Sequence, residues 1–421
     1  MSRPGLIPFD DALARLLGQA KPVGVTEQVP TMDAAQRVLA ESVVSPLSVP
    51  SWDNSQMDGY AVRCSEIAAM QAGEPDKSAN KPADEQAALR IAQRIPAGRQ
   101  GEPLAPGTVA RIFTGAAIPP GADAVVMQEQ ATLVGGDGDR VRFTHLPKPG
   151  EWIRREGEDI RSGATILPAG TRLTPQATGL AASVGAASLK VFGRVRVACF
   201  FTGDELVMPG QPLPPGAIYN SNRFLLTALL RRLGCDVIDM GIVGDSLQAT
   251  RAALREAAAE ADLIVTSGGM SVGEEDHVKP AVEAEGELSM WQIDIKPGKP
   301  LAYGRAQGAH FIGLPGNPVS SFVTFVLFVR PFILALQGVA QVAPARLRLA
   351  AGFDWPRPDR RREFLRVSVN AQTGLLELFP NQGSAVLTST VAGDGLLDNP
   401  GAQSIRHGDV VTYLPFSDLL N

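Results

Sequence analysis

Short apolar runs alternate with amphipathic segments between residues 194 and 338, and this alternation constrains the fold more than any other feature of the chain. Strands joined by helices of this length pair in parallel, because each crossover helix returns the chain to the same end of the sheet. A parallel sheet is covered on both faces, so the segment is predicted to be a doubly wound α/β domain. The expected strands are 195–201, 236–241, 262–266 and 310–314, and the expected helices are 222–233, 247–261 and a long one after 318.

The rest of the chain lacks this alternation of apolar runs and amphipathic segments, and 421 residues are too many for one hydrophobic core. We therefore predict a multidomain α/β protein of four domains. Short amphipathic helices are expected at 11–17 and 31–39, and helix and turn character returns after 146. The predicted domains are a discontinuous helical and linker domain (1–50 with 146–192), an inserted β-rich domain (51–145), the α/β domain (193–340) and a C-terminal β-barrel-like domain (346–421).

Composition excludes several classes of protein. The formal net charge is -5 and no long Lys/Arg run is present, which argues against nucleic acid as the main partner. Three widely separated cysteines predict neither a disulfide framework nor a zinc-thiolate site. The N-terminus lacks the pattern of a secretory signal, and Arg330 and Pro331 interrupt the most apolar stretch (319–336), which favours a buried helix over a membrane span. We expect a cytoplasmic protein with no membrane partner.

Three of the predicted strands end in unusual loops, at 202–205, 267–276 and 314–321. Ligands of a doubly wound sheet bind beyond the carboxyl ends of its strands. In the second loop, Gly268 and Gly269 allow a ligand close to the backbone, and consecutive amides can hold an anion. The acids Glu274, Glu275 and Asp276 follow at once, a combination that suits a nucleotide phosphate with Mg²⁺. The alternative is a glycine-rich turn whose acids only complement a helix dipole.

Other polar residues at the same predicted edge also have two interpretations. Asp204, Glu205 and Asp245 could orient a metal ion or a water molecule, or they could be solvated loop acids. Lys296 and Lys299, in the proline-stiffened sequence KPGKP, could bind a small oxyanion or form a solubilising turn. In PGNPVSS, Asn317 can cap a helix that Pro318 begins, and the N-terminus near Ser320 is also an anion site.

Taken jointly, these motifs resemble the MoeA / gephyrin E-domain family, the molybdopterin molybdenumtransferases. The resemblance runs over essentially the whole chain, and nine motifs occur in the right order, which makes chance similarity very unlikely. The motifs are DNSQMDGYA (53–61), RIFTGA (111–116), REGEDI (155–160), TGDEL (202–206), SGGMSVGEED (267–276), KPGKP (296–300), GLPGNPVSS (313–321), RREFLR (361–366) and QGS (382–384).

The resemblance implies an elongated homodimer whose α/β domain binds molybdopterin. The active cleft would form between that domain of one subunit and the inserted region of the other. The residues that it implies as catalytic are Asp58, Thr114, Asp159 and Glu205. Those implied as ligands of Mg²⁺ are Asp204, Glu205, Asp245 and Asp276. Those implied for binding molybdopterin and molybdate are Gly268, Gly269, Ser271, Lys296, Lys299, Pro300, Ser320, Arg361 and Ser384, with Arg362 as an alternative to Arg361.

The activity that the resemblance implies is insertion of molybdate into adenylated molybdopterin with release of AMP. Transient contacts with a molybdopterin adenylyltransferase and with apo-molybdoenzymes are expected. One alternative is the adenylyltransferase step itself or a related nucleotide pyrophosphatase, which share the Gly-Gly-acid domain but not the additional domains at both ends. A second alternative is a scaffold or anchoring protein, for which a separate fused domain and a long linker would be expected.

Overall fold

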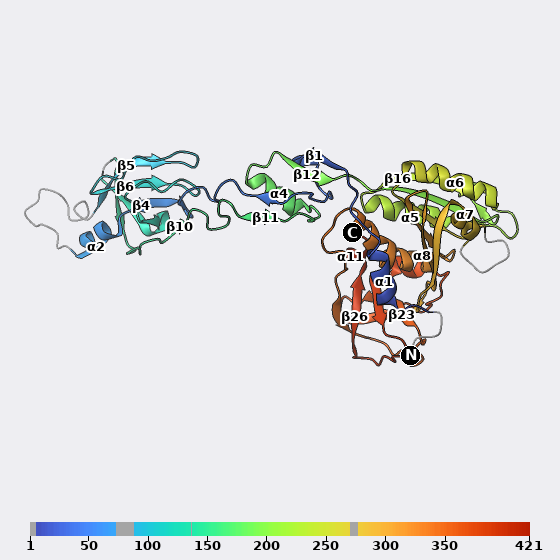
Figure 1. Cartoon of the computed structure of the whole chain (residues 1–421). Helices are drawn as coiled ribbons and strands as arrows, with labels where there is room; N and C mark the ends of the chain where they lie inside the picture. The colour runs from blue at the N-terminus through green and yellow to red at the C-terminus, as the bar shows by residue number, and fades with distance from the viewer. Residues whose placement is uncertain (1–5, 73–87, 136, 270–276) are drawn as a thin grey trace, which may run out of the picture. The chain divides into compact units, whose positions relative to one another are not determined.

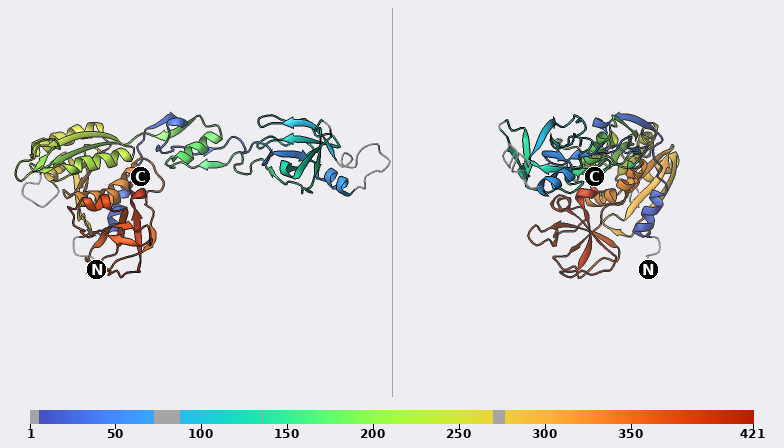
Figure 2. Two further views of the ribbon diagram at one scale, coloured as in Figure 1. Left: turned by 180° about the vertical axis from the view of Figure 1, so that it is seen from behind. Right: turned by 90° about the vertical axis from the view of Figure 1, so that its left-hand side faces the viewer.

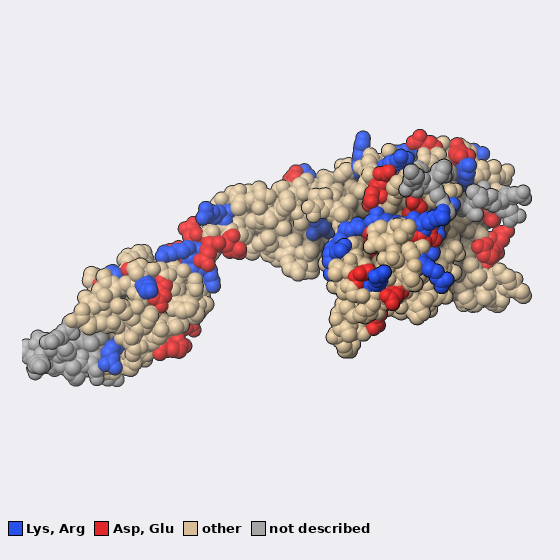
Figure 3. All heavy atoms as spheres, turned by 90° about the horizontal axis from the view of Figure 1, so that it is seen from below, with Lys and Arg blue, Asp and Glu red and all other residues tan. Residues whose placement is uncertain are grey.

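The chain folds into two compact units. The computed structural model describes residues 6–72, 88–135, 137–269 and 277–421. Unit 1 consists of 1–41, 169–178 and 187–421, and unit 2 consists of 42–168 and 179–186. Lys and Arg side chains are interspersed with Asp and Glu side chains on the visible face (Figure 3), in keeping with the small net charge of -5.

A six-stranded sheet in the order β16-β13-β17-β21-β20-β18 forms the centre of unit 1 (Figure 1). Its first four strands are parallel, and β20 and β18 add an antiparallel edge. The predicted doubly wound sheet is therefore confirmed. The strands are β13 (Arg196–Thr202), β16 (Asp236–Val243), β17 (Leu263–Ser267), β18 (Gly286–Gln292), β20 (Pro300–Ala306) and β21 (Ala309–Leu314).

Helices cover both faces of this sheet because its strands are apolar on both sides. On β13, Val197, Cys199 and Phe201 belong to one buried cluster with α5 and the α8–α9 segment, whereas Ala198 and Phe200 belong to a second cluster with α6 and α7. This alternation follows from the two-residue period of a strand. The helices are α5 (Ser221–Arg232), α6 (Leu247–Glu260), α7 (Val278–Glu285), α8 (Pro318–Thr324) and α9 (Arg330–Leu336).

The long apolar segment Pro318–Leu336 is buried in this core. It is long and apolar enough to cross a membrane, but 94% of its most apolar 18-residue window is buried inside the structure. A π-helical stretch, η3 (Phe325–Val329), joins α8 to α9. The buried guanidinium of Arg330 donates to the carbonyls of Asn421, Asp418 and Val342, so its donors are satisfied at the end of the chain. The expectation of a buried helix is confirmed.

The C-terminal residues of unit 1 form a second sheet in the order β19-β23-β25-β26-β22, with β24 paired to β23. Helix α1 (Phe9–Leu17) packs near it, since the Phe9 ring lies 5.1 Å from that of Phe328 and 5.4 Å from that of Phe364. Figure 2 shows the same part of the chain from behind. The barrel-like character expected here stays a prediction. The strands are β19 (Ile295–Lys296), β22 (Leu347–Ala350), β23 (Arg362–Val369), β24 (Leu376–Leu378), β25 (Gly395–Asn399) and β26 (Val410–Pro415), and the helices are α10 (Thr388–Ala392) and α11 (Phe416–Leu419).

Unit 2 is built on a mixed sheet in the order β7-β4-β6-β5-β9-β8. Its strands are β4 (Gly59–Val62), β5 (Leu89–Ile95), β6 (Thr108–Ile112), β7 (Ala124–Met127), β8 (Ala131–Val134) and β9 (Arg140–Phe143). Apolar residues are buried on both faces, and helix α2 (Cys64–Ala72) contributes to one of the two clusters. The smaller elements are η2 (Gln128–Gln130) and the strand pairs β2 (Val43–Val44) with β11 (Thr165–Leu167) and β3 (Asn54–Ser55) with β10 (Ile153–Arg154).

One local prediction was wrong, and a second was confirmed only in part. The helix expected at 31–39 is only a short 3-10 turn, η1 (Thr31–Asp33), because Val38 and Leu39 form bridges to Arg172 and Val191. The expected helix and turn character of 146–192 reduces to one helix, α4 (Pro175–Ser183), among short strands. One of these strands, β12 (Ser188–Phe192), pairs with β1 (Thr26–Pro30). Pairing between distant segments decided both outcomes, and it is not visible in local periodicity.

Candidate active site

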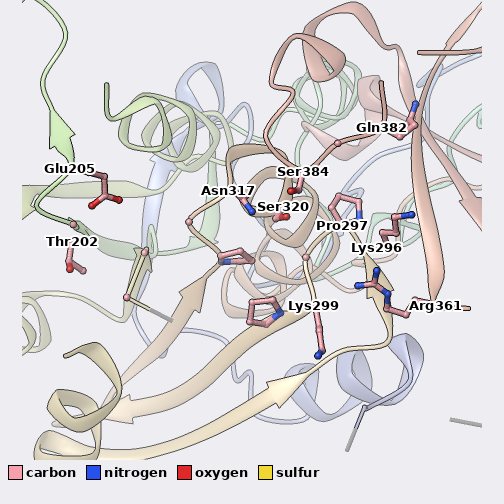
Figure 4. Close-up of a pocket in the computed structure, with 18 of the residues that line it drawn as sticks. Thr202, Glu205, Lys296, Pro297, Lys299, Asn317, Ser320, Arg361, Gln382 and Ser384 are labelled. Atoms are coloured by element: carbon pink, nitrogen blue, oxygen red, sulfur yellow. The ribbon is translucent and has the colours of Figure 1, made fainter. Parts of the chain in front are cut away.

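A cavity of about 700 Å³ lies at the carboxyl ends of β13, β17 and β21 in unit 1 (Figure 4). The chain leaves β13 through α5 to β16 on one side and then crosses through α6 to β17 on the other side. The strand order therefore reverses at β13, and ligands of such sheets bind at this kind of switch point. The three loops singled out in the sequence follow strands that are direct neighbours.

The cavity is acidic at one end and basic at the other. Figure 4 shows Glu205 and Thr202 on one side and Lys299 and Arg361 on the opposite side. At the acidic end, the Thr202 hydroxyl donates to the Asp245 carboxylate over 3.1 Å, which fixes that carboxylate beside the cavity. The structure thus places groups that suit a cation and groups that suit an anion within one cavity.

The loop after β17 approaches its neighbours so closely that only glycine fits. Gly268 has a φ of +102°, and a Cβ there would lie 2.6 Å from the carbonyl oxygen of Thr202. Gly269 also has a positive φ, of +60°. Glycine adopts these conformations without a steric cost, so the main chain itself forms this part of the wall.

A partly buried polar network holds the strand ends together beside this wall. The amide of Asn222 on α5 donates to the Ser267 hydroxyl and to the Gly316 carbonyl, each over 2.8 Å. The Ser267 hydroxyl in turn donates to the Pro315 carbonyl over 2.9 Å. These bonds join the ends of β17 and β21 to the start of α5, so they fix the spacing of two cavity loops.

The KPGKP loop provides the lysines of the basic end. Gly298 has a φ of +103°, and a Cβ there would lie 2.4 Å from the Thr324 hydroxyl oxygen. Lys296 Nζ lies 3.2 Å from a carboxylate oxygen of Glu363, which is fully buried. Lys299 has no ion pair with any residue that the structure describes.

Arg361, and not Arg362, lines the cavity. Arg362 turns away and binds Asp398 through two nitrogens, each over 2.6 Å. Asp359 binds the Arg361 guanidinium, and this contact holds the pKa of the aspartate well below its usual range. Of the two arginines that the sequence left as alternatives, the structure therefore places only Arg361 at the cavity.

The loop 382–384 carries Ser384 to the start of α8, where the Val319 amide donates to the Ser384 carbonyl over 3.0 Å. Arg366 supports this loop from below. Its buried guanidinium donates to the Gly383 carbonyl and to the Ser389 hydroxyl, and its backbone amide donates to the Gln382 side chain. Burial lowers the pKa of Arg366 to about 10. Ser384 lies near Ser320 of α8 in Figure 4.

A second hollow of about 560 Å³ adjoins the cavity. Both share Thr202, Glu205, Gly268, Gly316 and Asn317, so they form one continuous cleft. The far side of the hollow is lined by the start of α5 and by β15 (Ile218–Tyr219), which pairs with β14 (Leu206–Val207). The cleft is therefore long enough for an elongated ligand.

The candidate residues of unit 2 lie in two places within that unit. Asp58 accepts hydrogen bonds from the Thr114 amide (2.8 Å) and the Thr114 hydroxyl (2.7 Å), and the amide bond in particular lowers the pKa of Asp58. Asp159 lines a hollow of about 550 Å³ formed by residues 155–161 and 164–166. Asp58 and Thr114 thus act as a pair, whereas Asp159 belongs to another loop.

The structure brings most of the sequence-predicted residues of unit 1 into the cleft and leaves a few elsewhere. Asp204 is exposed and does not line the cavity. Ser271 and the acids Glu274, Glu275 and Asp276 lie outside the described residues. Those that line the cavity are Glu205, Asp245, Gly268, Gly269, Lys296, Lys299, Pro300, Ser320, Arg361 and Ser384.

Several residues that matter to this cavity were not predicted from the sequence to take part in ligand binding. Thr202, Asn317 and Gln382 line it, and each belongs to a motif singled out from the sequence, so motif membership was the available signal. Asn317 precedes α8 as expected, but its side chain makes no capping hydrogen bond. Asn222 acts only through tertiary contacts and carried no sequence signal.

Comparison with known proteins decides the family. Family models for the "MoeA N-terminal region (domain I and II)", the "Probable molybdopterin binding domain" and the "MoeA C-terminal region (domain IV)" match residues 7–185, 198–335 and 348–416. A Haemophilus influenzae protein named molybdopterin molybdenumtransferase is 39% identical over 99% of this chain and 100% of its own length. This chain belongs to the MoeA family. A Bacillus subtilis member of the same name is 33% identical over 97% of this chain and 94% of its own length.

Solved structures of MoeA proteins agree with this assignment. A molybdopterin biosynthesis MoeA protein from Pyrococcus horikoshii OT3 matches with a TM-score of 0.79 and 27% identity over 97% of this chain and 100% of its own. The family resemblance, the multidomain fold and the class of enzyme expected from the sequence are confirmed. Relatives that match over their full length carry the molybdenumtransferase name, which favours that activity over an adenylyltransferase, a pyrophosphatase or a scaffold.

Proposed function

We propose that this MoeA-family enzyme transfers molybdenum from molybdate to adenylated molybdopterin and releases AMP. The observation that carries the proposal is the cavity at the switch point of the sheet, with carboxylates at one end and cations at the other. Molybdate is a tetrahedral dianion, and the adenylated pterin carries a pyrophosphate. The two substrates need an oxyanion site beside a phosphate site within one cleft.

The basic end suits molybdate. Lysine supplies a compact point charge, and arginine supplies a planar fork that can bind two oxygens at once. Lys296, Lys299 and Arg361 meet here, and the Ser320 and Ser384 hydroxyls are available as further donors. Pro300 stiffens the loop that carries Lys299, so less side-chain and loop freedom is lost when the anion binds.

The glycine wall suits the pyrophosphate. The positive φ of Gly268 and Gly269 is compatible with consecutive amides directed at one anion, and the absence of side chains allows phosphate oxygens to approach the main chain. Ser271 follows these glycines in sequence and belongs to the same proposed phosphate site. The continuous cleft gives the two ends of the adenylated pterin room on either side of the wall.

The acidic end fits Mg²⁺, the metal that the family resemblance implies. No group of three metal-binding side chains is present among residues 6–72, 88–135, 137–269 and 277–421. Glu205 and Asp245 nevertheless line the cavity, and Mg²⁺ is commonly held by one or two carboxylates together with substrate phosphates. Asp204 and Asp276 complete the proposed ligand set. When bound, the ion would offset the pyrophosphate charge and activate water.

The chain's own residues would then orient the reactants. The Thr202 hydroxyl holds the Asp245 carboxylate toward the cleft, and the glycine wall positions the phosphoanhydride against Glu205. The lysines and Arg361 keep molybdate beside the dithiolene until two Mo–S bonds form and one molybdate oxygen leaves as water with the two thiol protons. The chain needs no thiolate ligand for this transfer, and its three cysteines are buried.

We also propose a cytoplasmic homodimer in which Asp58, Thr114 and Asp159 of a second copy complete the cleft. The support is the family resemblance together with the Asp58–Thr114 pair, which keeps the aspartate ionised and oriented. Such a dimer would receive its substrate from a molybdopterin adenylyltransferase and deliver its product to apo-molybdoenzymes through transient contacts.

The direct test follows AMP release from adenylated molybdopterin, with molybdate and Mg²⁺ varied independently. Wild type should release AMP only when both are present. Asp245→Asn should abolish release, and Lys299→Ala should raise the molybdate requirement without preventing binding of the pterin. The matched controls are Glu256→Gln and Lys279→Ala, which change exposed residues on α6 and α7.

Full turnover by Asp245→Asn would refute the metal role of that carboxylate. Asp204→Asn tests the exposed member of the proposed ligand set, and unchanged turnover would remove it from the set. Wild type that makes the adenylate from ATP and free molybdopterin would instead be an adenylyltransferase.

A further inference from the structure

Two of the three cations at the basic end are already bound to carboxylates. Asp359 Oδ2 lies 3.4 Å from Lys296 Nζ and 3.0 Å from Arg361 Nη2, so one carboxylate joins both cations. Glu363 lies 3.2 Å from Lys296 Nζ. Lys296 and Arg361 line the cavity, but Asp359 and Glu363 do not. The carboxylates therefore contact the cations from outside the cavity wall.

Asp359 leaves one edge of the Arg361 guanidinium available. Its two oxygens accept from Nε (3.1 Å) and Nη2 (3.0 Å), and Nη1 donates to the Ile295 carbonyl (3.4 Å). A guanidinium has five N–H donors, so one donor remains on each terminal nitrogen. Asp359 occupies the Nε/Nη2 edge and not the Nη1/Nη2 edge, and an edge of the latter kind can bind an oxyanion through two oxygens. Asp359 thus orients Arg361 for an oxyanion in the cavity.

Asp359 also reduces the charge at this end of the cavity. Lys296, Lys299 and Arg361 contribute three positive charges, and Asp359 and Glu363 contribute two negative ones. Asp294 adds a further negative charge near Arg361. Asp359 stays ionised, because the Arg361 guanidinium lowers its pKa. Attraction by net charge acts on every dianion alike. Hydrogen bonds from donors at fixed positions, in contrast, have a strength that depends on the size and shape of the anion.

We propose that Asp359 is a positioning and affinity-setting residue of the oxyanion end. It orients Arg361 and lowers the net charge, so that abundant dianions such as sulfate do not saturate the site. This inference rests on the proposed function, because it assumes that molybdate binds at Lys296, Lys299 and Arg361.

The experiment measures dissociation constants of molybdate and of sulfate by calorimetry on the full chain. Asp359→Asn removes the charge but keeps the size and one oxygen that can accept from Arg361, so the change in charge should dominate. We expect both dissociation constants to fall roughly tenfold at low salt. The gain should shrink as ionic strength rises, which a purely structural role would not produce. Asp359→Glu keeps the charge and should bind sulfate about as weakly as wild type. Glu377→Gln, an exposed acid of the same C-terminal sheet, is the control.

Turnover supplies a second measurement. At molybdate concentrations far below its dissociation constant, sulfate should inhibit AMP release by Asp359→Asn at roughly one tenth of the concentration needed for wild type. Unchanged or weaker binding of both anions by a folded Asp359→Asn protein would overturn the inference about Asp359. The proposed function would still stand if Lys299→Ala weakens molybdate binding. Failure of wild type to bind molybdate would overturn both.

Discussion

The ion pair between Lys296 and Glu363 makes Lys296 important for stability as well as for anion binding. Glu363 has no exposed surface, and its carboxylate accepts hydrogen bonds from Lys296 Nζ (3.2 Å) and Trp355 Nε1 (2.8 Å). In Lys296→Ala, the carboxylate keeps only the neutral indole donor. The variant should therefore be less stable than a change at a half-exposed lysine would ordinarily be.

The loss of unfolding free energy expected for Lys296→Ala can be estimated from two kinds of measurement on other proteins. A hydrogen bond to a charged group contributes about 1.5–3 kcal/mol, and breaking a buried ion pair costs about 3–5 kcal/mol. The Lys296 side chain is 40% exposed, so water can reach part of the site and the upper figure must be discounted. We expect a loss of about 2–3 kcal/mol.

Urea unfolding of Lys296→Ala, Glu363→Gln and the double variant measures this coupling. The double variant contains no unpaired buried charge, so its loss should be smaller than the sum of the single losses by about 2 kcal/mol. Molybdate binding should remain weak in the double variant, because the lysine charge is still missing. Additive losses would refute the claim that Lys296 stabilises the buried carboxylate.

Three further outcomes follow from single residues. Gly298→Ala should weaken molybdate binding and lower the unfolding free energy by about 1–3 kcal/mol, because its Cβ would meet Thr324 and its φ is +103°. Gly308→Ala, at a φ of +97° with nothing within 4 Å, should reproduce only the backbone part of that loss. Burial lowers the pKa of His310 to about 4. The contribution of neutral His310 to the free energy of unfolding is therefore complete above the ordinary pKa of 6.5 and disappears as the pH falls to about 4. His310→Gln should remove this dependence from unfolding curves measured at a series of pH values. Two arginines of α6 lower the pKa of Glu285 to about 2. The contribution of ionised Glu285 to the free energy of unfolding is therefore complete above pH 4.5 and is lost as the pH falls toward 2. If the stability of Glu285→Gln still declined over this pH range, Glu285 would not be the group responsible.

The α/β region was predictable because its local signals agree with its tertiary structure. The helix expected at 247–261 is Leu247–Glu260, and the strand expected at 310–314 is Ala309–Leu314. The prediction for residues 31–39 was wrong because the local signal and the tertiary structure disagree there. The apolar spacing of these residues suits a helix, but Val38 and Leu39 pair with segments more than 130 residues away in the chain. No local pattern records such a partner.

Residues that line the cavity could be predicted where they belong to a recognisable motif. Residues that only contact and orient those lining residues could not be predicted. Lys299, Ser320 and Ser384 were expected from their motifs, and all three line one cavity. Asp359 lies outside the motifs, and its importance follows only from its contacts with Lys296 and Arg361.

The central claim is that molybdate binds at the basic end of the cleft in unit 1. Crystals soaked in molybdate and measured at the molybdenum absorption edge would test it most directly. We predict an anomalous peak in contact with Lys299, Arg361 and Ser384, which is lost in Lys299→Ala crystals. A strong peak elsewhere on the chain, with none in this cavity, would contradict the account.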